Sequence, residues 1–140
     1  MMTKHFFYVI AVLFAAVFSP GVASEEEAVT FKTQYIEMKP AFVTNYGTPG
    51  KKKLKYVKAD ISLRVTSKDA ADAVEAHMPY LRNEVVLLLS SQSESTMSDP
   101  IGQDTVRKLA LEAVNKVLSV EAGKGVEVDD LLFTNFVVQR

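Results

Sequence analysis

The sequence contains no cysteine, no tryptophan and only two histidines. Without cysteine the chain can form no disulfide, thiolate nucleophile or zinc–cysteine site, so its core alone must hold a folded domain together. His5 lies in the apolar N-terminal segment described below, which leaves His77 as the single histidine of the remaining chain. These absences leave little material for nucleophilic or metal-dependent chemistry.

The chain also lacks a large excess of charge of either sign. Its 16 basic and 17 acidic residues give a net charge of −1 at pH 7. When residues 1–24 are set aside, Lys4 is lost and the net charge becomes −2. A nucleic-acid-binding protein normally presents a basic face, so the sequence predicts no nucleic-acid partner.

One long apolar run is present, and it lies close to the first residue. Lys4 precedes the run at residues 6–18, which the pair Pro20-Gly21 ends before the small residues 22–24. A basic start, a short apolar core, a helix-breaking pair and small residues are the pattern of a secretory signal peptide. We expect cleavage after residue 23 or 24.

An uncleaved membrane anchor is the alternative interpretation of the same segment. A helix that spans a bilayer needs about 20 apolar residues, whereas this run has roughly 13. Continuing to residue 23 gives a marginal span that Pro20 and Gly21 interrupt. Residues 1–24 are therefore expected to be a signal peptide or a short anchor, residues 25–30 a linker, and residues 31–140 one domain.

Short strand patterns follow this linker. Residues 31–38 alternate loosely, Pro40 interrupts them, residues 41–46 continue as an extended piece, and residues 47–50 predict a turn. Strict alternation makes residues 54–66 the clearest strand signal, with one face packed and one in water. The apolar side comprises Val57, Ala59, Ile61, Leu63 and Val65, and the polar side comprises Lys58, Asp60, Ser62 and Arg64.

A helix is predicted directly after this strand. Ser67 or Asp69 can cap its first turn, and apolar residues at three- and four-residue spacing continue to Leu89. Pro79 cannot donate its amide, so we expect the helix to kink or restart there. Residues 90–99 are polar and predict a loop.

A second helix and a final strand complete the pattern. Asp99 followed by Pro100 predicts a capped helix start, and Gly123 predicts its end. Residues 126–139 predict a strand that is apolar on both faces, which favours a place within the sheet or beneath a partner. We expect it to pair with residues 54–66. Simple alternation assigns Leu132, Thr134, Phe136 and Val138 to one face, and Leu131, Phe133 and Val137 to the other.

The order of these elements is strands, two helices and a strand. It predicts an α+β domain in which an antiparallel sheet has two helices packed on one face.

Candidate chemistry in this pattern is sparse. His77 has helical spacing from apolar residues and is expected to be structural and partly buried. Asp129 and Asp130 would point to opposite faces of a strand, so a solvated turn is expected there. Residues 47–52 lack the spacing of a phosphate-binding loop. Four aromatic residues near the first strands could mark an interface or cover the sheet: Tyr35, Phe42, Tyr46 and Tyr56.

Four segments of the chain resemble, in order, the FliL family of flagellar basal-body-associated proteins. Residues 35–45 resemble its opening motif, an aromatic residue, a proline and Phe-Val-x-Asn, and residues 78–90 resemble its Pro-x-Ile-Arg-Asp/Asn segment with a Leu-Ser ending. Residues 102–118 resemble its second helix, and residues 128–139 resemble its closing Val-Leu-Phe-Thr-x-Phe-Val-x-Gln, the most specific of the four. The motif positions, expected to be structural or interacting, are Pro40, Phe42, Asn45, Pro79, Arg82, Gly102, Phe133, Phe136 and Gln139.

This resemblance implies a small periplasmic α+β domain, similar to stomatin-type domains, that self-associates into rings. It implies a non-enzymatic role with no catalytic residue, no metal and no cofactor. The partners implied are the stator proteins of the flagellar motor, near the basal body, with effects on flagellar rotation, motility and chemotaxis. A ring needs two different patches, and we expect them on the polar faces of residues 54–66 and 100–122.

The N-terminus departs from the family pattern. Typical members have a short cytoplasmic segment, a spanning helix and a linker, whereas here the apolar run starts at residue 6 and is short. The expected location is the periplasm, either soluble after cleavage or attached to the inner membrane through residues 6–23. Two other hypotheses are a soluble binding or chaperone-like module with a different partner, and a hydrolase built around His77.

Overall fold

The computed structural model of the chain describes Gly21, residues 30–50 and residues 53–140. The predicted signal peptide or anchor, apart from Gly21, lies outside the described residues, as does most of the predicted linker. Within the described part, no helix is both long enough and apolar enough to cross a bilayer.

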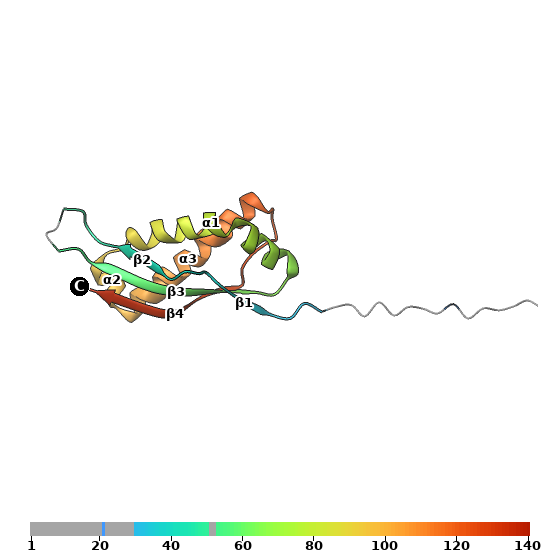
Figure 1. Ribbon diagram of the computed structural model, residues 1–140, viewed down its shortest axis with the longest axis horizontal. Helices are drawn as coiled ribbons and strands as arrows, with labels where there is room; N and C mark the ends of the chain where they lie inside the picture. Colours follow the sequence, from blue (N-terminus) through green and yellow to red (C-terminus); the bar gives the residue numbers. More distant parts are fainter. Residues whose placement is uncertain (1–20, 22–29, 51–52) are drawn as a thin grey trace, which may run out of the picture.

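The sheet is built around one long central strand (Figure 1). Its four antiparallel strands are β1 (Gln34–Glu37), β2 (Phe42–Asn45), β3 (Tyr56–Val65) and β4 (Asp130–Gln139). The short strands β1 and β2 both pair with β3, at residues 62–65 and 56–59 respectively. The strand β4 pairs with β3 along nearly its whole length, which confirms the predicted return of the last strand.

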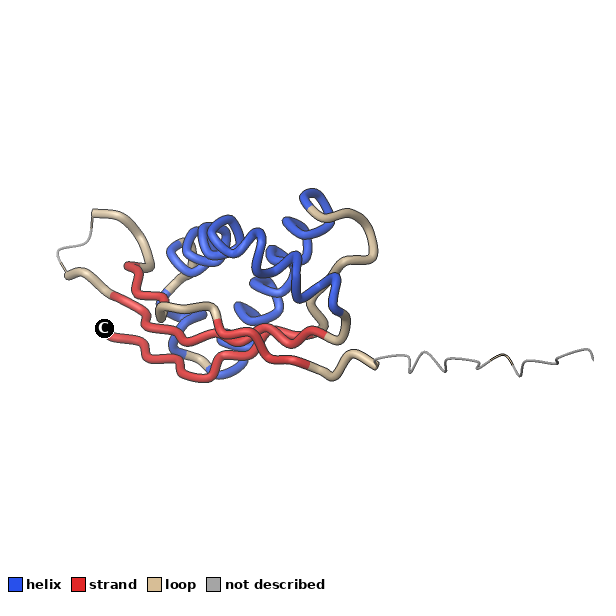
Figure 2. The backbone as a smooth tube through the Cα atoms, turned by 45° about the vertical axis from the view of Figure 1, so that its right-hand side comes forward, coloured by secondary structure: helices blue, strands red, loops and turns tan. Residues whose placement is uncertain are grey.

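Three helices lie on one side of this sheet (Figure 2). They are α1 (Lys68–Ser90), α2 (Glu94–Ser98) and α3 (Pro100–Glu121). The predicted caps are confirmed, because Ser67 Oγ accepts from the Ala70 amide at 3.1 Å and Asp99 Oδ2 accepts from the Gly102 amide at 2.9 Å. The end of α3 is followed by Gly123 at φ 104°, a conformation that favours glycine. The predicted α+β class is confirmed.

The core lies between the helices and the inner face of β3. All five residues predicted for that face are at most 2% exposed. The opposite face is less open than predicted: Ser62 is buried, and Asp60 and Arg64 are half-buried. Ser62 lies between Glu37 of β1 and Leu132 of β4 in the register, so its small side chain is flanked on both sides.

The predicted loop at residues 90–99 is wrong, and of the predicted kink or restart at Pro79 the restart is wrong. Residues 90–99 are not entirely a loop, because α2 forms there with Ser93 as its cap and Met97 fully buried beneath it. The segment is polar apart from Met97, and burial of this one side chain anchors α2. The helix α1 also does not restart at Pro79 but continues through it to Ser90.

The predicted faces of β4 are also wrong. The register shifts where Asp60 pairs with Asn135 but Ile61 pairs with Phe133, so Thr134 forms a bulge. Because of this extra residue, the side chains on its two sides no longer alternate between the sheet faces as simple alternation predicts. Phe133 and Phe136 therefore both pack against the core. Of the two places predicted for β4, within the sheet or beneath a partner, the first is wrong, since among the described residues β4 pairs only with β3.

Candidate interaction surfaces

The residues considered for catalysis are not brought together. His77 is half-buried on α1. Asp129 is exposed in the bend before β4, where it accepts a hydrogen bond from Thr66 Oγ1 at 2.9 Å, whereas Asp130 pairs with Arg107. Across residues 30–50 and 53–140, no group of three or more histidines, aspartates or glutamates could hold a metal ion.

Three of the family-motif residues meet beside the junction of β1 and β2. Arg82, on α1, donates from Nη1 to the carbonyl oxygens of Met38 at 2.8 Å and Pro40 at 2.7 Å. Its guanidinium carbon lies 4.1 Å from the centre of the Phe42 ring, a cation–π arrangement. Burial lowers the pKa of Arg82 from its ordinary value, and the side chain remains a cation at neutral pH. Arg82 therefore fastens α1 to the strand junction.

A second group of motif residues lies at one end of the sheet. Asn45, Tyr56 and Gln139 are neighbours across β2, β3 and β4, and the next row is Val43, Lys58 and Val137. Val43, Tyr56 and Val137 are 67%, 40% and 52% exposed. We call Val43, Tyr56, Lys58, Val137 and Gln139 the outer-face patch; they line a shallow hollow of about 320 Å³. The patch lies on the sheet face opposite the helices, so it is an apolar surface available for contact.

Of the remaining motif residues, Phe133, Phe136 and Gly102 serve packing. Phe133 and Phe136 lie on either side of the bulge with ring centres 4.7 Å apart and ring planes tilted by 43°. Gly102 lies against the α2 backbone, where a Cβ atom would come within 2.1 Å of the Thr96 carbonyl oxygen. Pro79 is exposed on α1. Of the four aromatic residues singled out earlier, Phe42 and Tyr46 are buried, and Tyr35 and Tyr56 are exposed.

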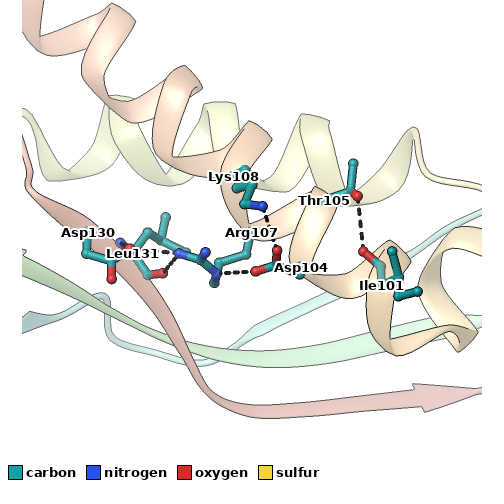
Figure 3. A network of polar contacts seen from close by, with 7 residues as sticks. All are labelled: Ile101, Asp104, Thr105, Arg107, Lys108, Asp130 and Leu131. Atoms are coloured by element: carbon teal, nitrogen blue, oxygen red, sulfur yellow. Dashed lines mark hydrogen bonds and ion pairs between the residues drawn. The ribbon is translucent and has the colours of Figure 1, made fainter.

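A polar network joins α3 to the start of β4 (Figure 3). Arg107 Nη1 donates to Asp130 Oδ1 at 2.7 Å and to the Leu131 carbonyl at 3.2 Å, while its Nε donates to Asp104 Oδ1 at 2.9 Å. Lys108 pairs with Asp104 at 2.8 Å. Hydrogen bonds from Lys108 and then Arg107 hold the pKa of Asp104 below its ordinary value of 3.8.

The depressed pKa of Asp104 predicts a pH-dependent contribution to stability. Asp104→Asn should lower the free energy of unfolding slightly above pH 3.8, where the unfolded carboxylate is charged. The difference from the wild type should shrink as pH falls through the lower folded-state pKa. Urea titrations between pH 7 and pH 2.5 measure it. Ser119→Ala, at another exposed position of α3, removes no titrating group and should give a constant difference.

A smaller polar pocket lies between the β2–β3 connection and α2. Lys55 pairs with Glu94 in its lining, which also includes Tyr46, Gly47, Lys53 and the serines at positions 93 and 95, and its volume is about 230 Å³. The sequence patterns predicted neither this pair nor the Arg107 network. Both join segments more than 20 residues apart, and unlike a cap or an alternating strand, such pairs leave no local signal.

The family model for the flagellar basal body-associated protein FliL matches residues 35–139. The chain is also similar to the flagellar protein FliL of Aquifex aeolicus (strain VF5), with 26% identity over 121 residues that cover 86% of this chain and 68% of the relative. The family match begins within β1 and ends with the last residue of β4, so it spans the domain described above.

Proposed function

This chain belongs to the FliL family of flagellar basal body-associated proteins, and we propose that it associates with the stator proteins of the flagellar motor and supports rotation. The family match from β1 to β4 is the observation that carries the proposal, because it includes all strands and helices of the described domain. The proposed location is the periplasm, either soluble or attached to the inner membrane at the basal body.

The proposed mechanism is binding and self-assembly without catalysis. Two separate surfaces support it. One is the outer-face patch, and the other is the exposed side of α3, where Ile101 and Val120 are 78% and 75% exposed and Leu109 is 39% exposed. Different patches that meet head to tail are what a ring requires. We propose that these two surfaces serve ring contacts and stator contacts.

A clean deletion of the gene tests the role in rotation. We expect reduced spreading in soft agar and reduced swarming, both restored by the wild-type chain supplied in trans, because the family functions at the flagellar basal body. Assembled filaments should be counted in the same cells, so that loss of rotation is separated from loss of the flagellum. Normal swimming and swarming in the deletion strain would contradict the proposal.

Recovery of the tagged full-length chain from crosslinked envelopes tests the partner. Stator subunits should be recovered with it, and Lys58→Glu in the outer-face patch should reduce the yield. Lys32→Glu is the matched control, because it makes the same charge change at an exposed position before β1, outside both surfaces. Recovery of other proteins and no stator subunit would reject stator association. N-terminal sequencing of the recovered chain shows whether residues 1–24 are retained.

A further inference from the structure

The two outer edges of the sheet differ in how they are closed. At the junction of β1 and β2, Arg82 donates hydrogen bonds to the carbonyl oxygens of Met38 and Pro40. At the start of β4, Arg107 binds the Leu131 carbonyl and Asp130 Oδ1 accepts from the Leu131 amide at 2.9 Å. The bulge at Thr134 then interrupts the strand. Within the described part of the chain, residues 135–139 of β4 therefore form an open edge, whose outward backbone groups pair with no other strand.

Two backbone hydrogen bonds at β3 determine which backbone groups of this open edge point outward. The Tyr46 amide donates to the Lys55 carbonyl, and the Met38 amide donates to the Ile61 carbonyl, so odd-numbered residues of β3 point toward β1 and β2. Alternation in an antiparallel ladder then directs the backbone of Tyr56, Lys58 and Asp60 toward β4. These three residues pair with Gln139, Val137 and Asn135, so the residues of β4 that alternate with them are Phe136 and Val138. The backbone groups of these two residues point away from β3, where no described residue pairs with them.

The side chains of this segment divide cleanly between the two faces. Val137 is 52% exposed and belongs to the outer-face patch, with Asn135 and Gln139 exposed beside it on the same face. Phe136 and Val138 are half-buried and pack against the core. The open edge thus has an apolar centre on both faces and an amide side chain on either side of that centre.

We propose that this edge pairs with the same edge of a second copy, antiparallel and about a two-fold axis through Val137. In this register Phe136 of each copy pairs with Val138 of the other copy. The outward N–H of each residue donates to the outward carbonyl oxygen of its partner. The two Val137 side chains are directly opposite. Asn135 is opposite Gln139 of the second copy, and the reverse, on the outer face. The result is one continuous sheet across the two copies.

The sequence of the edge favours a second copy over an unrelated strand. Every cross-strand pair in this register joins like chemistry: valine with valine, phenylalanine with valine, and asparagine with glutamine. No charged side chain of residues 135–139 opposes another. The same register also uses the whole open segment, residues 135–139. If the two copies paired closer to the N-terminal end of β4, the Thr134 bulge would interrupt the hydrogen bonds between them.

This inference goes beyond the function proposed above and does not depend on it. A two-fold contact is isologous and closes after two copies, whereas a ring needs a head-to-tail contact that repeats. Edge pairing would therefore join two copies, alone or between assemblies, through the outward backbone groups of Phe136 and Val138, which side-chain contacts of the outer-face patch do not use. The contact is short, so we expect a weak dimer that depends on concentration.

A single introduced cysteine tests the register directly, because the natural chain contains none. Val137→Cys in the full-length chain places two thiols opposite each other at the axis, within reach of a disulfide. After mild oxidation of envelope fractions, non-reducing gels should show about tenfold more covalent dimer than Val43→Cys gives. Val43 is the matched control, since it is a more exposed valine on the same face but lies on β2.

A charge substitution supplies the second measurement. Val137→Lys places two ammonium groups face to face and should weaken dimerisation about tenfold in crosslinking at matched concentration, whereas Leu87→Lys, at a similarly exposed position of α1, should leave it unchanged. Equal covalent dimer from both cysteine variants would overturn the proposal. So would a chain that is monomeric at all concentrations but captures a strand of another protein in a Val137-dependent manner. Loss of motility with dimerisation intact would bear only on the proposed function.

Discussion

Arg82→Ala is expected to lower the free energy of unfolding by about 2–3 kcal/mol. The substitution removes two charge-assisted hydrogen bonds, to the carbonyls of Met38 and Pro40, and the contact of the guanidinium with the Phe42 ring. Met38 is buried, so water replaces its lost partner poorly. Chemical denaturation of the wild type and the variant measures the loss.

Hydrogen exchange should locate the effect of this change. Arg82 fastens the junction of two short strands that share one edge of β3, so the amides of Met38 and of residues 42–45 should exchange faster in the variant. Arg82→Lys keeps the charge but loses the planar fork, and should fall between the alanine variant and the wild type. Asn83→Ala, at the exposed neighbouring position, is the control. If Arg82→Ala lowered the free energy of unfolding to within about 0.5 kcal/mol of the control, Arg82 would not fasten α1 to the strand junction as described.

Gly102→Ala is expected to destabilise the domain by about 3 kcal/mol, although glycine to alanine within a helix usually stabilises by about 1 kcal/mol. The added Cβ atom would lie 2.1 Å from the Thr96 carbonyl oxygen and 2.9 Å from the Thr96 Cα atom. These are backbone atoms of α2 and cannot rotate away. The sign of the change is therefore diagnostic of the close approach of α2 to α3.

The thermal midpoint of the Gly102→Ala variant should fall by roughly 10 °C. Ser119→Ala is the matched control, because it increases helix propensity at an exposed position of the same helix and meets no such clash. The core residue Met97 would be displaced with α2, so near-UV spectra and limited proteolysis around residues 93–98 should change as well. An unchanged or raised thermal midpoint would show that α2 can move away without cost.

The sequence alone predicted those parts of the fold whose signals are local. The alternation of β3, the cap at Ser67 and the Asp99-Pro100 helix start each lie within a few residues, and each is confirmed. The family was identified in the same way, from short motifs in the correct order. These signals also predicted the pairing of the last strand with β3, because two strands with complementary apolar faces must bury them together.

Only the tertiary structure decided how distant segments meet. The bulge at Thr134 reverses the faces of β4, and no residue type at that position announces it, because a bulge is a property of two strands in register. The same is true of Arg82, whose partners lie more than 40 residues away, and of Gly102, whose need for glycine comes from another helix. Short-range patterns determine which elements form, whereas register and packing between them depend on the energy of contacts that the chain makes only when folded.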